Sequence, residues 1–210
     1  MPNNYEKLRP YWEAWKSADP ADSALRDGMI EICKALAGDN SAKPPSDAFS
    51  AALELRTESL EYLKGLDDFD ASTQKLKVYR GITDDAANRL RRATKGVQLY
   101  EEEAGVPISY STSRGAALGF ARKGKYLGAL YQQFISLESA GFIDRGYYKD
   151  GNLHAEAEIL VCRSEPVTIA NSDVVEAKVD PQKHGFHSKA DKQKWEQERE
   201  RLKNEDSQDF

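Results

Sequence analysis

Two glutamates stand two positions apart in the apolar segment HAEAEILV, residues 154–161. The alternation of this segment predicts a strand, in which residues i and i+2 face the same side. Glu156 and Glu158 are therefore expected to lie side by side. Two adjacent carboxylates can stabilise a developing cation or accept a proton. They also occur on the solvated face of an antiparallel strand, and the segment alone fits both interpretations.

An arginine and a glycine end an earlier expected strand, KLKVYRG at residues 75–81. The guanidinium of Arg80 is permanently charged and offers a planar fork of donors suited to phosphate. Gly81 has no side chain, so a ligand can approach its backbone closely. The alternative is an arginine that forms a salt bridge at a strand end.

A run of hydroxyl residues, STS at 111–113, ends the expected strand 106–113. Ser113 is placed to cap the short helix expected at residues 115–122. Ser111 lies two residues earlier, on the strand itself, where its hydroxyl can fix the orientation of a carboxylate.

The order Arg80, then STS, then the glutamate pair resembles the arginine–serine–glutamate class of mono-ADP-ribosyltransferases over roughly residues 76 to 180. That class includes bacterial toxins and effectors and phage enzymes. The resemblance implies an α+β fold, in which an N-terminal helical layer precedes two small, mostly antiparallel sheets around an NAD cleft. It also implies that NAD is a substrate and that no metal takes part.

Roles on the NAD side follow from the resemblance alone. Arg80 would hold an NAD phosphate, the backbone of Gly81 would meet the nicotinamide carboxamide, and Phe120 or Tyr126 would pack on nicotinamide. The implied NAD-binding residues are Arg80, Gly81, Ser111, Thr112, Phe120 and Glu158.

Roles on the acceptor side follow in the same way. Ser111 would position Glu158, the catalytic carboxylate, and Glu156 would engage the guanidinium of an acceptor arginine. Tyr147 and Tyr148, in the segment before the glutamate pair, would contact the target protein. The implied catalytic residues are Arg80, Ser111, Glu156 and Glu158.

The function expected from this resemblance is transfer of ADP-ribose from NAD to an arginine of a target protein, with release of nicotinamide. A cleaved NAD ribose carries positive charge at C1′, which an adjacent carboxylate favours. Three alternatives remain open: an NAD glycohydrolase on the same fold, transfer to a non-protein acceptor such as nucleic acid, and a catalytically silent binding module.

The composition limits the partners. The 210 residues carry a net charge of −5, with 40% hydrophobic and 31% charged residues, so the overall field does not recruit nucleic acid or an anionic membrane. The basic stretch 89–96 fits the solvated face of a helix. Cys33 and Cys162 lie in apolar surroundings, make no metal motif or disulfide framework, and suit a reducing compartment. No signal or membrane-spanning segment is recognised, so we expect action in a cytosol, possible also after delivery into another cell.

Three regions are expected along the chain. Residues 1–70 are expected to form helices, with Asp19 and Ser46 as helix caps. Residues 71–187 form the expected transferase core of short strands and helices. Residues 188–210 are charged throughout and are expected to be a loosely docked helix or a disordered tail.

Overall fold

A computed structural model describes residues 4–17, 19–124, 126–143, 148–149, 152–153, 158–179, 193, 196–197 and 200–201. The fold is α+β with antiparallel strand pairs, in agreement with the expected class. The chain divides into two compact units. The first unit comprises Met1–Val78, Glu103–Thr112 and Phe134–Val167. The second unit comprises Tyr79–Glu102, Ser113–Gln133 and Thr168–Phe210.

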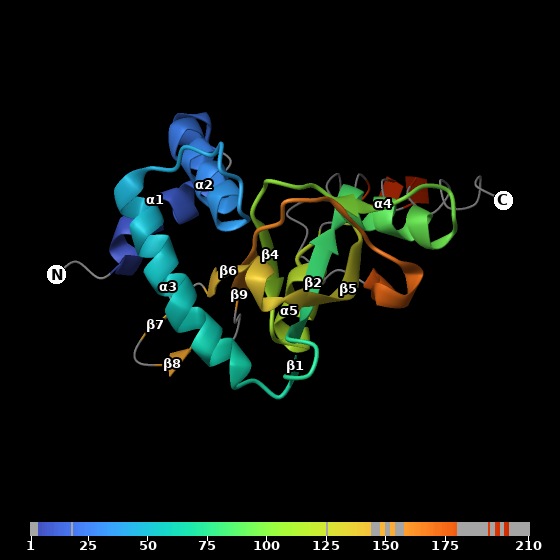
Figure 1. The fold of residues 1–210 in the computed structure, drawn as a ribbon. Helices are drawn as coiled ribbons and strands as arrows, with labels where there is room; N and C mark the ends of the chain where they lie inside the picture. The colour runs from blue at the N-terminus through green and yellow to red at the C-terminus, as the bar shows by residue number, and fades with distance from the viewer. Residues whose placement is uncertain are drawn as a thin grey trace. The chain divides into compact units, whose positions relative to one another are not determined.

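Helices begin the first unit. They are α1 (Asn4–Lys16), the short 3-10 helix η1 (Pro20–Asp22), α2 (Ser23–Leu36) and α3 (Ser46–Lys64). Helix α1 packs against both α2 and α3, and α3 also packs along strand β6 (Ala140–Ile143) (Figure 1). The expected helical segment at the N-terminus is therefore present.

The two expected helix caps differ in outcome. Asp19 caps η1, since its carboxylate accepts a hydrogen bond of 2.9 Å from the backbone N–H of Ala21. The cap assigned to Ser46 is wrong: Ser46 is already the first helical residue, and the extended Pro45 holds the cap position. The carbonyl of Pro45 accepts the first helical bond, 2.8 Å from the N–H of Phe49.

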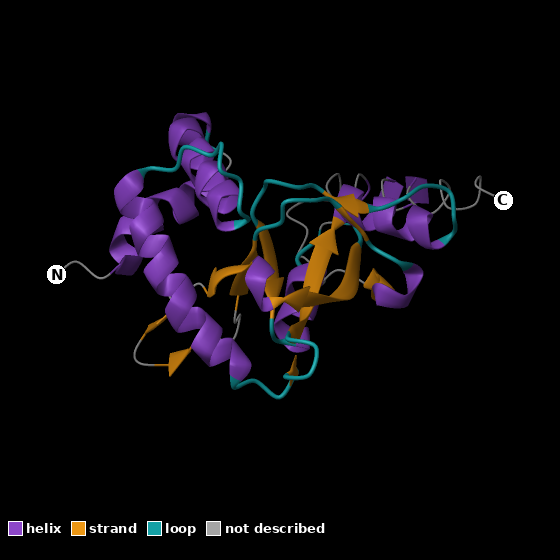
Figure 2. Ribbon diagram, viewed as in Figure 1, coloured by secondary structure: helices purple, strands orange, loops and turns teal. Residues whose placement is uncertain are grey.

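Strands follow the helices along the chain. Their bounds are β1 (Phe69–Asp70), β2 (Lys75–Thr83), β3 (Glu101–Glu102), β4 (Ile108–Ser111), β5 (Gly128–Ser136), β6, β7 (Tyr148–Lys149), β8 (Asn152–Leu153), β9 (Glu158–Val161), β10 (Val167–Thr168) and β11 (Val174–Val179). Two further 3-10 helices are η2 (Leu137–Ser139) and η3 (Asn171–Asp173). Within the first unit, β9 lies between β4 and β6 and is antiparallel to both (Figure 2).

The strand order corrects one expectation about the sheets. In the described residues a single hydrogen-bonded path, β11-β5-β2-β4-β9-β6, holds most strands, and two-residue pairs form the remaining sheets. Two small, mostly antiparallel sheets were expected.

The first unit is built around one hydrophobic core, the helix–β9 core. It joins the N-terminal helices to the strand that carries Glu158, because Leu8 and Trp12 of α1 pack in the same cluster as Leu160 of β9. Its buried members are Leu8, Trp12, Met29, Ile32, Cys33, Leu36, Ala48, Ala52, Leu55, Leu160 and Cys162. The N-terminal helices thus supply most of the apolar surface that covers one face of β9.

The second unit has its own smaller core, with α4 (Asp84–Thr94) and α5 (Arg114–Arg122) packed against β11. Ser113 caps α5 as expected, accepting a bond of 3.3 Å from the N–H of Ala116. The buried members of this core are Tyr79, Ala117, Ala121, Leu130 and Val179.

Candidate active site

Strand pairing places two of the predicted site residues directly opposite each other. In the antiparallel β4–β9 pair, Ser111 is the register partner of Glu158. Side chains of directly opposed residues project to the same face and are close neighbours. The register therefore brings Ser111 beside Glu158, and the role of Ser111 in positioning that carboxylate stays a prediction.

Glu158 is buried, not solvated. Only 8% of its surface is exposed, and all four residues of β9 are buried. The interpretation of Glu158 as part of a solvated strand face is therefore wrong, because α1 covers that face: Leu160, two residues along β9, packs with Leu8 and Trp12. A buried carboxylate needs a compensating partner.

That partner comes from the N-terminal helices. The ammonium of Lys16, the last residue of α1, lies 2.6 Å from Oε2 of Glu158. It also lies 4.5 Å from the centre of the Trp12 ring, close enough for a cation–π contact. No described residue bonds to the other carboxylate oxygen, Oε1.

Arg80 lies in the second unit and is held by a second buried carboxylate. Its Nη1 is 2.7 Å from Oε1 of Glu102 and donates to the hydroxyl of Tyr131 at 3.3 Å. The hydroxyl of Tyr131 donates to the same oxygen of Glu102. Tyr100 packs edge-on against Tyr131, and burial raises the pKa of its hydroxyl. The salt-bridge alternative for Arg80 is therefore realised, while its contact with an NAD phosphate stays a prediction.

The glycine after Arg80 has a structural reason of its own. A Cβ atom at Gly81 would lie 1.9 Å from the carbonyl oxygen of Ala117, and one at Gly128 would lie 2.1 Å from that of Ala121. These two glycines let α5 lie directly on the backbone of β2 and β5. The predicted approach of nicotinamide to Gly81 is not tested by this packing.

The remaining predicted residues of the NAD side are half-buried. Thr112 follows β4, and Phe120 lies on α5 with the ammonium of Lys123 over its ring at 4.1 Å. The backbone N–H of Tyr126 donates to the carboxylate of Asp84 at 2.8 Å. Their contact with nicotinamide stays a prediction.

Acceptor-side predictions fall mostly outside the described residues. Tyr147 and Glu156 lie outside them. Tyr148 belongs to β7, where its backbone pairs with Leu153 of β8. Their roles at the acceptor stay predictions.

Three residues that contact Glu158 or Arg80 were not predicted from the sequence: Lys16, Glu102 and Tyr131. A signal for Lys16 existed, because Leu8, Trp12 and Lys16 recur every four residues and so share one helix face. Glu102 stands in the middle of a run of three glutamates, which reads as solvated, and Tyr131 reads as an ordinary core residue. Neither carried a local signal.

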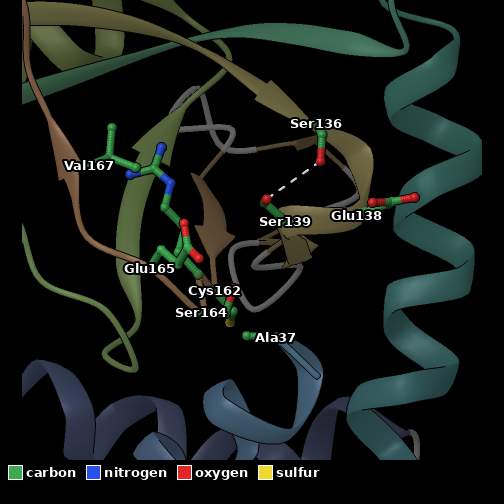
Figure 3. Close-up of a pocket in the computed structure, with 9 residues that line it drawn as sticks. Ala37, Ser136, Glu138, Ser139, Cys162, Ser164, Glu165 and Val167 are labelled. Atoms are coloured by element: carbon green, nitrogen blue, oxygen red, sulfur yellow. Dashed lines mark hydrogen bonds between the residues drawn. The ribbon is translucent and has the colours of Figure 1, made fainter. Parts of the chain in front are cut away.

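A pocket of about 300 Å³ opens in the first unit, just after β9 (Figure 3). Its lining includes Cys162, Arg163 and Glu165, and the hydroxyls of Ser136 and Ser139 point toward each other at 3.5 Å. None of the predicted site residues lines this pocket. It is therefore a separate feature from the Ser111–Glu158 arrangement.

Comparison with known proteins adds no family. No protein-family model matches the chain, and no curated protein or solved structure matches it. Among the described residues, no group of His, Cys, Asp and Glu side chains could hold a metal ion, and none of the helices is long and apolar enough to cross a bilayer.

Proposed function

We propose that this chain is a mono-ADP-ribosyltransferase of the arginine–serine–glutamate class, which moves ADP-ribose from NAD to arginine side chains of a target protein. The observation that carries the proposal is the register of Ser111 against the buried, ion-paired Glu158. These are the residues of the STS and glutamate-pair motifs, which stand far apart in the sequence. The finer fold proposed is the ADP-ribosyltransferase fold with an NAD cleft.

The proposed reaction needs a negative charge beside C1′ of the ribose that carries nicotinamide. The bond between C1′ of the ribose and nicotinamide breaks, and nicotinamide leaves with the electron pair. Positive charge then develops on the ribose, as in glycoside hydrolysis. The carboxylate of Glu158 stabilises that charge more in the transition state than in the ground state, which is what accelerates a reaction.

The acceptor completes the transfer. A guanidinium nitrogen of the target arginine forms the new bond to C1′ and gives up a proton, which Glu156 accepts while it orients the group. Arg80 holds an NAD phosphate, with Gly81, Thr112 and Phe120 in the NAD site. Tyr147 and Tyr148 contact the target protein. The proposed place of action is a cytosol, as for a toxin or effector.

Two measurements on one sample test the proposal. The protein is incubated with NAD and arginine amide, with lysine amide as the matched control acceptor, and both nicotinamide release and the labelled acceptor are measured. The proposal expects nicotinamide release with labelling of arginine amide but not of lysine amide. Release without a labelled acceptor would identify a glycohydrolase, and no release would reject both. Glu156→Gln should reduce labelling far more than release, and an equal reduction would remove the role given to Glu156.

A further inference from the structure

The N-terminal helix α1 reaches the carboxylate of Glu158 by a regular arrangement. Leu8, Trp12 and Lys16 recur at intervals of four residues, so they lie along one face of α1. Glu158 and Leu160 are two residues apart in β9, so they share one face of the strand. Leu8 and Trp12 pack in the same core as Leu160, and Lys16 meets Glu158. One helix face therefore matches one strand face, apolar against apolar and cation against anion.

This match fixes the position of the Lys16 ammonium. Leu8 and Trp12 are 1% and 2% exposed, so the helix face is anchored in the core. The indole of Trp12 lies under the ammonium. The helix ends at Lys16, where the helix dipole also favours a cation. The side chain thus loses little additional freedom when it pairs with Glu158.

The geometry at the carboxylate leaves one side for a substrate. Lys16 bonds to Oε2, whereas no described residue bonds to Oε1. Ser111 stands opposite on β4. A carboxylate that rotates freely presents its charge in many directions, whereas one tied at a single oxygen presents the other oxygen in a fixed direction.

We infer that Lys16 is a positioning residue for Glu158: its ammonium holds Oε2 and directs Oε1 to the reacting ribose. The inference rests on the proposed function for the identity of the substrate. It assigns the N-terminal helices a direct part in the site and not only in the core. The competing interpretation is that the ammonium occupies the place of the cationic substrate and inhibits the enzyme.

Rate measurements on Lys16 variants of the full chain separate these two interpretations. Lys16→Met keeps the length of the aliphatic stem and its packing on Trp12 but removes the charge. We expect kcat for nicotinamide release to fall about 10-fold to 100-fold, the scale of a small misplacement of a reacting group, with little change in KM for NAD. Lys16→Arg restores a cation and should recover most of the rate. An unchanged or faster Lys16→Met enzyme would overturn the inference.

A matched control comes from the same helix. Arg9 is an exposed cation of α1 that forms ion pairs within the helix, with Glu6 at 3.9 Å and with Glu13 at 2.7 Å. Arg9→Met changes the net charge by the same amount and should leave kcat unchanged. A loss in Arg9→Met equal to that in Lys16→Met would attribute the effect to overall charge and overturn the inference.

Melting temperatures test the contact without any activity. Lys16→Met and Glu158→Gln each remove one partner, so each should lower the melting temperature, and the double variant should lose less than the two losses together. Strict additivity would overturn the contact, and with it the positioning role. A wild-type protein that releases no nicotinamide would instead reject the proposed function, while this comparison would still decide whether Lys16 holds Glu158.

Discussion

Each unit holds one buried glutamate whose carboxylate forms an ion pair with a lysine or an arginine side chain, and the two nitrogen–oxygen distances are nearly equal. Lys16 lies 2.6 Å from Glu158 and Arg80 lies 2.7 Å from Glu102. Their surroundings differ. The side chain of Glu102 is 1% exposed and receives a second hydrogen bond from Tyr131, whereas that of Glu158 is 10% exposed and keeps one oxygen without a bond to a described residue.

The difference separates two uses of a buried ion pair. A carboxylate that is almost fully buried and bonds to two side chains of its own unit holds those side chains in place. A carboxylate with unused capacity at a strand end can bind something that the protein does not supply. We therefore expect Glu102 to contribute mainly to stability and Glu158 mainly to activity.

The largest effect should come from Glu158→Gln, which removes charge with little change of shape. We expect nicotinamide release and arginine labelling to fall by about 10²-fold to 10³-fold, the scale for loss of one preorganised electrostatic group. Stability should change by only about 1 kcal/mol or less, because the Lys16 partner is partly exposed and solvent screens the pair. Steady-state kinetics and a denaturant titration measure both. Near-normal turnover of Glu158→Gln would contradict the expectation that Glu158 contributes mainly to activity.

The opposite balance is expected for Glu102→Gln. Removal of one partner of a buried ion pair costs about 3–5 kcal/mol, and we expect about 2–3 kcal/mol here because the Arg80 side chain is 29% exposed. Denaturant unfolding gives this free energy directly. Under conditions where the variant remains folded, kcat should fall much less than in Glu158→Gln. A stable variant with abolished kcat would reverse the assignment of the two glutamates.

Gly81→Ala tests the rigidity of the backbone that carries Arg80. The added Cβ would lie 1.9 Å from the Ala117 carbonyl, and we expect a loss of about 1–3 kcal/mol, as for other overpacked sites. Gly119, in the same helix α5, has open space around its Cβ position and is the matched control. Gly119→Ala should stabilise the protein by about 0.5–1 kcal/mol through helix propensity. Melting curves that shift both variants in the same direction would contradict this packing.

The smallest expected effect is that of Arg80→Lys on NAD binding. The charge is kept, but an ammonium cannot reproduce the planar fork of the guanidinium, which bonds to Glu102 and is proposed to bind a phosphate of NAD. We expect the dissociation constant for NAD, measured by calorimetry, to rise about tenfold, the equivalent of about 1.4 kcal/mol. Arg89→Lys, on α4 in the same unit, controls for the general loss of a guanidinium. Unchanged NAD affinity in Arg80→Lys would leave Arg80 with a structural role alone.

Local patterns predicted the elements well. The expected strands at 75–81 and 106–113 correspond to β2 and β4, and the helix capped by Ser113 is α5. These elements are recognisable because alternation, helical spacing and capping are properties of neighbouring residues. Ser46 shows the limit of such predictions: serine is a favourable capping residue, but the proline before it holds the cap position.

Long-range pairing could not be predicted in the same way. The Lys16–Glu158 bond joins residues 142 positions apart, and it depends on α1 packing over β9 rather than on either local sequence. Glu102 illustrates the same point, because its burial is decided by Tyr131 and Arg80 and not by its glutamate neighbours. The opposition of Ser111 and Glu158 was expected only through the resemblance to a family, not from spacing.

Alkylation of the buried Cys33 thiol measures how often the helix–β9 core opens. Cys33 and Cys162 are both free and buried in that core, and contact with Cys162 together with burial raises the pKa of the Cys33 thiol. An alkylating reagent attacks the thiolate, so the Cys33 thiol should not react until the core opens. The rate of alkylation in native buffer therefore reports how often the N-terminal helices separate from β9, the strand that carries Glu158.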